Sequence, residues 1–281
     1  MRSFIFYLPI LYTYITRLRT PLKCFSWSCI YVIPIICLLF LQNAQWNISI
    51  MNILFTLLVI VTVYNFYEIG YIQNDTETIK NEHKPTARLS AEMLGYYERH
   101  KELIYLQRMV QGLLLIFSLW LLKAELTGCI LFLFAMVLLL LVYQFYNHIR
   151  GHWNMILYFM LVSIRYCSPL LLFSDNLSWS LFVLALMVFP VIKTTEFRST
   201  KPTEITTNIY FRRYIIKFDK NRITGYRVMA YAFLSLIAFF FYWISFFSFM
   251  DVCLILYMFL FRCSLYLLIK SGFVFHEYLK N

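Results

Sequence analysis

Two carboxylates and a tyrosine stand close together at the end of the second long apolar segment of the chain. Glu68 and Asp75 are seven residues apart, with Tyr71 between them. In a continuous helix of about 100° per residue, this spacing returns both carboxylates to one face, within roughly 20°. Carboxylates bind Mg²⁺, which neutralises phosphate groups. Glu68, Tyr71 and Asp75 are therefore candidate catalytic residues, with Glu68 and Asp75 as ligands of one Mg²⁺; the alternative is solvated acids at a frayed helix end.

Basic and hydroxyl side chains at other segment ends are suited to binding the same phosphate. Tyr146 and Arg150 are one helical turn apart, so they can present a hydroxyl and a cation to one anion. Arg165 and Arg262 lie near the middle of apolar segments, where an arginine costs about 2.5–3.5 kcal/mol on insertion scales and should face the bundle interior. Structural pairing and attraction to lipid headgroups are the alternatives. The candidate substrate-binding residues are Lys84, Arg88, Tyr146, Arg150, Arg165, Lys193, Glu196, Arg198 and Lys201.

The elements that position these residues must be membrane-spanning helices. Hydrophobic residues make up 61% of the 281 residues and charged residues only 14%, whereas globular domains are about half apolar and about a quarter charged. This composition excludes a soluble enzyme, a disordered tail and a disulfide scaffold. We expect an all-α polytopic bundle of eight spans, with nine as the alternative, at about 26–42, 49–69, 104–122, 128–146, 154–173, 178–194, 226–248 and 252–270.

The charge distribution predicts the orientation of this bundle. Lys and Arg number 25 against 14 Asp and Glu, a net charge of +11. Most of the basic residues fall on one side of the predicted spans, which the positive-inside rule makes cytoplasmic, together with both termini. Residues 1–25 are expected to form an interfacial helix on the membrane. One membrane domain follows over 26–281, with long cytoplasmic loops at 70–103 and 195–225.

The stretch from Glu68 to Leu89 resembles the first signature motif of the UbiA superfamily of intramembrane prenyltransferases. That motif reads N-D-x-x-D-x-x-x-D, followed by R-P and a turn of small residues. Asp75 matches its last Asp, Glu68 the Asp beside the Asn, and Lys84, which precedes Pro85, the Arg. Tyr67 and Tyr71 depart from the motif, because they stand where the family has the Asn and the middle Asp.

Two later landmarks extend the resemblance. The family has a Tyr with a basic residue four positions on after the fourth span, which Tyr146 and Arg150 match. Its second Asp-rich motif, after the sixth span, aligns both of its Asp residues with Thr194 and Lys201. Glu196 is the only acid left there, so a second Mg²⁺ site lacks ligands, and the basic residues nearby are suited to binding phosphate directly.

The resemblance implies a transferase that acts on an isoprenoid (di)phosphate, moving a prenyl chain to an acceptor with diphosphate as the leaving group. One alternative is glycosyl or phosphoribosyl transfer from a sugar diphosphate to polyprenyl phosphate for cell-surface polysaccharide synthesis. Another is a non-catalytic transport or scaffold protein on a decayed transferase fold. The implied cofactor is Mg²⁺ and the partners are the isoprenoid phosphate and membrane lipids, without nucleic acid. The expected location is a bacterial inner membrane, with the active site on the cytoplasmic side.

Overall fold

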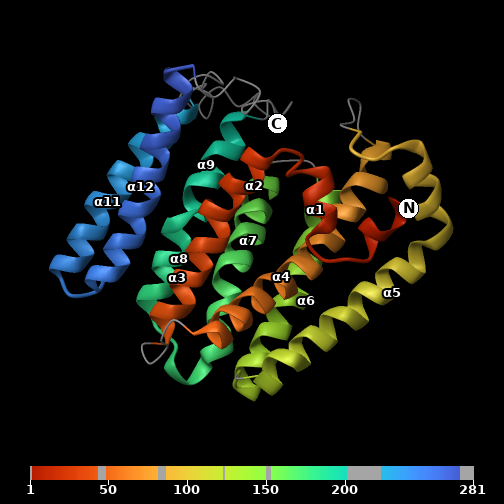
Figure 1. Ribbon diagram of the computed structural model, residues 1–281, viewed down its shortest axis with the longest axis horizontal. Helices are drawn as coiled ribbons and strands as arrows, with labels where there is room; N and C mark the ends of the chain where they lie inside the picture. Colours follow the sequence, from red (N-terminus) through yellow and green to blue (C-terminus); the bar gives the residue numbers. More distant parts are fainter. Residues whose placement is uncertain are drawn as a thin grey trace.

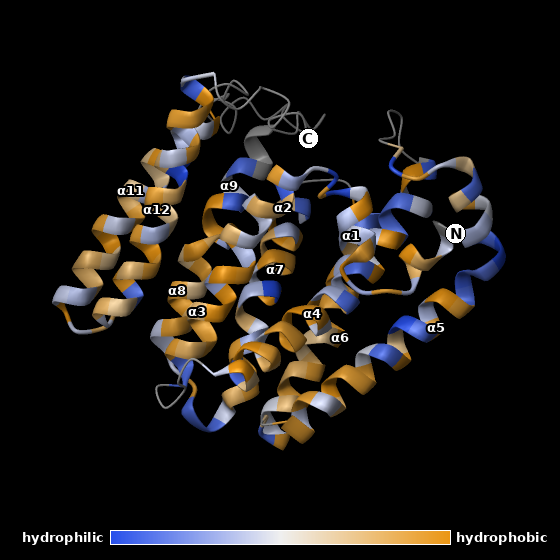
Figure 2. Ribbon diagram, viewed as in Figure 1, coloured by the Kyte–Doolittle hydropathy of each residue, from blue (hydrophilic) through white to orange (hydrophobic). Residues whose placement is uncertain are grey.

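The computed structural model describes residues 2–43, 49–81, 87–122, 124–149, 153–200 and 223–272. Over these residues the chain is helical, without strands, and eight of its helical segments are long and apolar enough to cross a membrane. They pack into one bundle (Figure 1), and most of their length is apolar (Figure 2). Each segment overlaps one of the predicted runs. The prediction of an all-α, eight-span integral membrane protein is therefore confirmed over the described residues.

Two of the first four spans are not single straight α-helices, because the third is kinked at His100 (φ −125°, ψ 16°) and the first is composite. The first span joins two α-helices through a short π-helical segment, and its second α-helix carries a proline in its first turn. The π segment runs directly into this helix, since the Ile33 amide donates to the Ser28 carbonyl, so the proline interrupts a continuous helix at its π turn. The bounds are α2 (Pro21–Trp27), η2 (Ser28–Val32), α3 (Ile33–Gln42), α4 (Ile50–Thr76), α5 (Ala91–Leu122) and α6 (Leu126–His148).

The last four spans end in a hairpin that stands at one side of the bundle. This hairpin, α11–α12, touches the remaining helices through α3, α8 and α9 (Figure 1). Helix α4 lies among α3, α5 and α6, and α7 packs between α6 and the α8–α9 span. The bounds are α7 (Trp153–Cys167), η4 (Ser168–Asn176), α8 (Trp179–Val188), α9 (Pro190–Thr200), α11 (Ile223–Trp243) and α12 (Phe249–Lys270).

A proline divides the sixth span. Helix α8 ends at Val188, Phe189 leaves the helical region at φ −149° and ψ −48°, and α9 begins at Pro190. Proline has no amide hydrogen, and its ring clashes with the carbonyl four residues earlier, so the helix breaks before it. The break matters for function because Phe189 and Lys193 on either side of it both face the cavity described below.

Helices α4 and α5 are longer than a membrane requires. At about 1.5 Å per residue, the 32 residues of α5 reach about 48 Å, against a hydrocarbon layer about 30 Å thick. Residues 70–76 continue α4 and residues 91–103 begin α5. The predicted cytoplasmic segment 70–103 therefore begins and ends in helix, and its place on the cytoplasmic side stays a prediction. Polar residues there remain helical because the helix satisfies its own backbone, and the Ser90 hydroxyl accepts a hydrogen bond from the Met93 amide at 3.4 Å at the start of α5.

The N-terminal segment packs against these extensions. Instead of one interfacial helix over 1–25, the chain forms η1 (Arg2–Phe6) and α1 (Leu11–Thr16), and α2 of the first span already starts at Pro21. The expectation of one continuous helix is therefore wrong, and a position at the membrane surface stays a prediction. Some apolar side chains of this segment lie in a small core with the ends of α4 and α5, formed by Ile5, Phe6, Tyr12, Ile72, Leu89, Met93, Tyr97 and Ile104.

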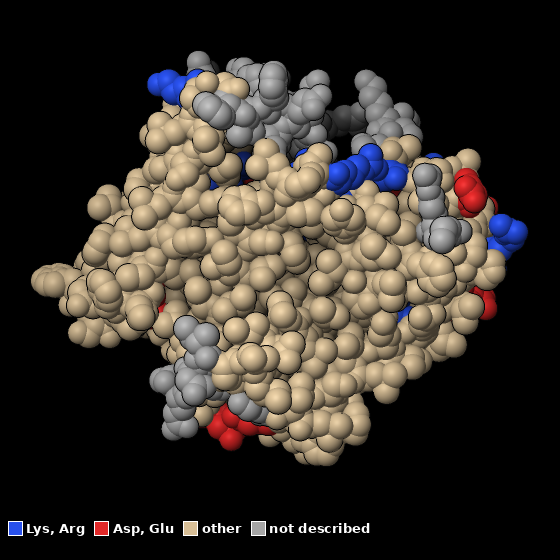
Figure 3. All heavy atoms as spheres, in the orientation of Figure 1, with Lys and Arg blue, Asp and Glu red and all other residues tan. Residues whose placement is uncertain are grey.

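Charged side chains are distributed unevenly over the bundle. Figure 3 shows Lys and Arg along one rim, an acidic patch at the opposite edge with further acidic atoms at one side near the basic rim, and a broad surface that carries almost no charge. We call the end that carries Arg17, Lys23, Arg88 and Lys193 the basic end. At the other end, Glu125 accepts a hydrogen bond from the amide of Asp175 at 2.9 Å. This asymmetry follows the predicted pattern, and the assignment of the basic end to the cytoplasm stays a prediction.

Gly128 allows a close approach that holds α6 against η4. A Cβ atom at Gly128 would lie 2.5 Å from the carbonyl oxygen of Leu172, whereas one at Gly95 would meet nothing within 4 Å. We expect Gly128→Ala to lower the free energy of unfolding by about 1–3 kcal/mol, because the backbone atom in the way cannot rotate aside. Gly95→Ala is the matched control, and should stabilise the helix by up to about 1 kcal/mol.

Thermal unfolding of both variants in detergent measures the difference. A Gly128→Ala protein that unfolds at the temperature of the wild type would show that α6 and η4 do not pack this closely.

Candidate anion-binding site

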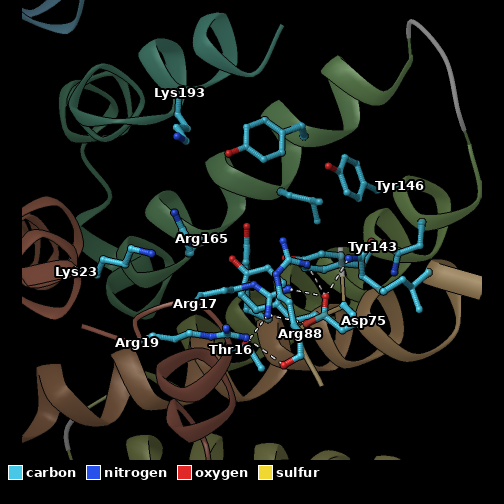
Figure 4. A pocket seen from close by; sticks show the side chains of 18 of the residues that line it. Thr16, Arg17, Arg19, Lys23, Asp75, Arg88, Tyr143, Tyr146, Arg165 and Lys193 are labelled. Atoms are coloured by element: carbon cyan, nitrogen blue, oxygen red, sulfur yellow. Dashed lines mark hydrogen bonds and ion pairs between the residues drawn. The ribbon is translucent and has the colours of Figure 1, made fainter. Parts of the chain in front are cut away.

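A cavity of about 790 Å³ opens at the basic end, between the α1–α2 connection and helices α4, α6, α7 and α9. Its wall is strongly basic and rich in tyrosine, and within the described residues it contains a single carboxylate. Figure 4 shows Arg17, Arg88 and Asp75 joined at one part of this wall, with Lys193 and Tyr146 in the surrounding helices. The basic residues are Arg17, Arg19, Lys23, Arg88, Arg165 and Lys193, the carboxylate is Asp75, and the tyrosines are Tyr67, Tyr71, Tyr143, Tyr146 and Tyr158.

Asp75 holds two arginines from different parts of the chain. Arg17 binds both of its carboxylate oxygens, at 2.8 and 3.1 Å, and Arg88 binds Oδ1 at 2.9 Å. The Tyr12 hydroxyl donates to Oδ2 at 3.0 Å. The carboxylate is fully buried, while 18% of the Arg17 side chain and 32% of the Arg88 side chain remain exposed. Asp75 therefore fixes two guanidinium groups whose outer edges reach the cavity.

The surroundings keep this cluster in one charge state. Burial, and then the neighbouring Asp75 carboxylate, raise the pKa of the Tyr12 hydroxyl well above its ordinary value. Burial by itself would lower the pKa of the Arg17 guanidinium, but the attraction of Asp75, its hydrogen bonds and the neighbouring tyrosines together outweigh burial, and the pKa is raised. The guanidinium also lies over the Tyr71 ring, 3.6 Å from its centroid. Arg17 thus stays a cation and Tyr12 stays a hydrogen-bond donor.

Glu68 lies on the same helix face as Asp75, as predicted, but it serves the N-terminal segment. Its two oxygens accept hydrogen bonds from the amides of Ile10 and Thr13, at 3.0 and 2.6 Å. These are the N-cap and third residue of α1, so Glu68 caps a helix whose own N-cap side chain offers no acceptor. Arg108 completes the arrangement with an ion pair at 3.1 Å between two fully buried side chains.

Arg108 attaches the N-terminal segment to α5. Besides Glu68, its guanidinium donates to the backbone carbonyls of Phe6 at 2.7 Å and Leu8 at 3.1 Å. It also donates to the Asn65 side chain at 3.3 Å. These acceptors give hydrogen-bond partners to the guanidinium N–H groups of this buried arginine. The Glu68–Arg108 pair therefore holds the N-terminal segment against α4 and α5, and neither residue lines the cavity.

The carboxylates do not fit the predicted Mg²⁺ ion. Mg²⁺ requires near-octahedral oxygen ligands at about 2.1 Å. Both oxygens of Glu68 already accept amide hydrogens, and both oxygens of Asp75 accept guanidinium hydrogens. Within the described residues no group of three or more His, Cys, Asp or Glu side chains is placed to hold a metal ion. Each carboxylate is thus neutralised by arginine and not by a metal ion.

Arg165 is a half-buried cation surrounded by aromatic rings. The centre of its guanidinium lies 4.9 Å from the ring centroid of Tyr67 and 5.1 Å from that of Tyr31. Tyr166 and Phe189 follow at 5.5 and 5.8 Å. Cation–π contacts of this kind stabilise a desolvated arginine. Its Nε–H has no hydrogen-bond partner among the described residues, although the side chain lines the cavity.

Lys193 lines the cavity from α9 and belongs to a second charged group, with Glu196 and Arg227. Its ammonium lies 3.0 Å from Glu196, which also accepts two hydrogen bonds from Arg227, at 2.6 and 2.9 Å. One carboxylate therefore balances two cations here. Because Arg227 is on α11, Glu196 also links the α11–α12 hairpin to the cavity wall.

The inner wall is built from tyrosines that pack edge to face. The Tyr67 ring centroid lies 5.1 Å from that of Tyr71 and 5.0 Å from that of Tyr143, with interplanar angles of 87° and 83°. A Cβ atom at Gly70 would lie 2.2 Å from the Tyr143 ring. The glycine thus lets this ring settle against α4. Such a wall offers both apolar ring faces and hydroxyl groups to a ligand.

The structure brings six of the predicted site residues together at the cavity wall, places two behind it, and does not describe the side chains of the other four. Glu68 and Glu196 lie behind the wall in ion pairs. Lys84, Arg150 and Lys201 fall outside the described residues, as does the side chain of Arg198. The six that line the cavity are Tyr71, Asp75, Arg88, Tyr146, Arg165 and Lys193.

Sequence reasoning missed the contribution of the N-terminal segment and of three tyrosines. The basic pair Arg17 and Arg19 precedes the first span, a position that also suits lipid headgroups, so the sequence did not distinguish a site from a membrane surface. The only sequence signal for Tyr67 was its place in the UbiA-like motif. The missed residues are Arg17, Arg19, Lys23, Tyr67, Tyr143 and Tyr158.

Together, the fold and the cavity define an integral membrane protein of eight helical spans with a basic, tyrosine-lined cavity at one end. Comparison of the chain with protein-family models, with curated proteins and with solved structures finds no match. The resemblance to the UbiA superfamily therefore rests on the residues of the motifs themselves.

Proposed function

We propose that this protein is an intramembrane transferase that acts on an isoprenoid (di)phosphate, as a divergent member of the UbiA superfamily. In the proposed reaction, a prenyl chain moves to an acceptor and diphosphate leaves. One observation carries the proposal: six basic side chains and five tyrosines line one cavity, whose only carboxylate within the described residues is already paired with two arginines. Such a wall suits a ligand that is strongly anionic at one end and unsaturated and apolar at the other.

The site residues act on the two ends of such a substrate. The bond between the allylic carbon and oxygen breaks, and the diphosphate departs with the electron pair. Arg88 and Lys193 neutralise the growing negative charge, as preorganised cations do in a water-poor site. The ring faces of Tyr67 and Tyr143 stabilise the positive charge on the allylic carbon. The acceptor then forms the new bond to that carbon and releases its proton to solvent at the open mouth.

A second candidate is transfer from a sugar diphosphate such as phosphoribosyl diphosphate to polyprenyl phosphate. The excess of cations in the cavity favours this candidate, because both of its substrates carry phosphate. The segment that aligns with the second Asp-rich motif adds to this, since its acid, Glu196, is occupied by Lys193 and Arg227. The third reading, a non-catalytic transport or scaffold protein, is decided by the same experiment.

Isotope transfer in membranes distinguishes these candidates. Membranes that contain the protein, together with a lipid extract as a source of acceptor, are incubated with labelled prenyl diphosphate or with labelled phosphoribosyl diphosphate. We expect label from the prenyl diphosphate in a new lipid product, and a much weaker signal with Arg88→Ala. Arg99→Ala, which removes an exposed cation on α5, is the matched control.

The other outcomes would contradict the proposal. Label that enters lipid only from phosphoribosyl diphosphate would establish the second candidate. No transfer from either donor, together with an unchanged cell phenotype in the Asp75→Asn variant, would support the non-catalytic reading.

A further inference from the structure

Among the described residues, the ion pairs around the cavity contain more cations than carboxylates. The Asp75 carboxylate is shared by Arg17 and Arg88, and Glu196 is shared by Lys193 and Arg227. Each group therefore keeps one unit of positive charge. Arg165 adds another, because no carboxylate of the described residues forms an ion pair with it. Uncompensated charge inside a membrane protein is costly, which makes a bound anion the natural counterpart of these cations.

We infer that this cavity binds a diphosphate group through fixed cations, without a divalent metal ion. The inner contacts come from Arg165 and Lys193 and the outer contacts from Arg17 and Arg88. The substrate class rests on the proposed function, whereas the mode of binding rests on the arrangement of the charges.

Arg165 is placed to form the inner contact. Aromatic rings surround its guanidinium at 4.9 to 5.8 Å, so a ligand reaches its hydrogens along the edge of the group. The Nε–H is buried without a partner among the described residues, and it belongs to a side chain that lines the cavity. Guanidinium groups donate along their edge to two oxygens of one phosphate. The unpartnered donor is thus explained by a ligand that supplies an oxyanion.

Arg88 is placed to form the outer contact. The guanidinium has five N–H donors, and its Nη1 donates to Asp75. About a third of the Arg88 side chain is exposed. Asp75 in turn has both oxygens engaged by guanidinium groups. Asp75 therefore acts as a support that holds two cations toward the ligand. A metal ion on Asp75 would have to displace these arginines.

Calorimetry on the purified full-length protein tests the inference, with inorganic diphosphate and farnesyl diphosphate as probes. Each titration is run in EDTA and again in Mg²⁺. We expect affinities that agree between the two conditions, and a loss of roughly tenfold in both Arg165→Met and Lys193→Met, the size of one charge-assisted contact. Arg99→Met lowers the net charge by the same amount as these two variants, but at an exposed position. It should bind diphosphate with the affinity of the wild type.

A stability measurement separates loss of the ligand contact from loss of the fold. Arg165→Met replaces a half-buried cation, which has no carboxylate partner among the described residues, by an apolar side chain. The variant without ligand should therefore unfold at the same temperature as the wild type or at a higher one. The added stability that diphosphate gives to the wild type should be lost.

Binding that appears only with Mg²⁺, or that is unchanged in both variants, would overturn the inference, as would a complete absence of binding. Its failure is distinct from failure of the proposed function. Metal-free binding without isotope transfer would contradict only the function, and transfer with Mg²⁺-dependent binding would contradict only this inference.

Discussion

Replacing Arg108 by methionine is expected to lower the free energy of unfolding by about 3–5 kcal/mol, because the change leaves the Glu68 carboxylate buried without its cation. Both side chains are fully buried and 3.1 Å apart. The variant also loses the donors to the carbonyls of Phe6 and Leu8. We expect the N-terminal segment to detach first, with increased proteolysis between η1 and α2. Unfolding in mixed micelles and limited proteolysis measure the two effects.

The double variant Glu68→Gln with Arg108→Met isolates the charge pair. Without either charge, no buried ion remains uncompensated, and the double variant should recover a large part of the stability that Arg108→Met loses. If the double variant is as unstable as Arg108→Met, the N-terminal segment is held by the hydrogen bonds from Arg108 to the backbone carbonyls and not by the ion pair. Arg99→Met changes an exposed site on α5, so its free energy of unfolding should equal that of the wild type.

Replacing Asp75 by asparagine is expected to reduce the proposed transfer activity by about 100-fold, the effect of a small displacement of positioning groups in an active site. Asparagine keeps the shape but removes the charge that holds Arg17 and Arg88 together. Both guanidinium groups then repel each other and move outward, so the outer half of the anion site is lost. The isotope-transfer assay measures the activity, and diphosphate titration should show weaker binding in parallel.

Asp175→Asn is the matched control for this variant. Asp175 is an exposed carboxylate at the opposite end of the bundle, so the same chemical change there should leave activity as it is. An Asp75→Asn protein with wild-type turnover would show that Asp75 does not organise the site.

Parts of the site were predictable because they depend on neighbours in the chain. Glu68, Tyr71 and Asp75 share a face of α4 since the helix continues through them, which only required that no proline or glycine run break it. Arg165 was expected to face the interior because its charge excludes it from lipid. Both expectations concern one helix and its solvent, and the structure agrees with them.

The partners of these residues were not predictable in the same way. Asp75 meets Arg17, 58 residues earlier, and Glu68 meets Arg108, 40 residues later. The sequence alone suggested a shared metal ion for the two carboxylates. The packing of the N-terminal segment across α4 instead gives each carboxylate its own arginine, and so changes the expected chemistry from metal binding to direct binding by cations.

Composition and hydropathy were thus enough to predict eight spans, one basic end and an interior arginine, because burial in lipid is decided over roughly 20 consecutive residues. Which charge neutralises which, and the packing of residues 2–19 against α4 and α5, required the tertiary structure. An apolar segment such as Ile5–Tyr12 is stable against lipid or against a protein groove. The ends of α4 and α5 add hydrogen bonds to the backbone of this segment that lipid does not provide. Glu68 accepts from the Thr13 amide, and Arg108 donates to the Phe6 carbonyl.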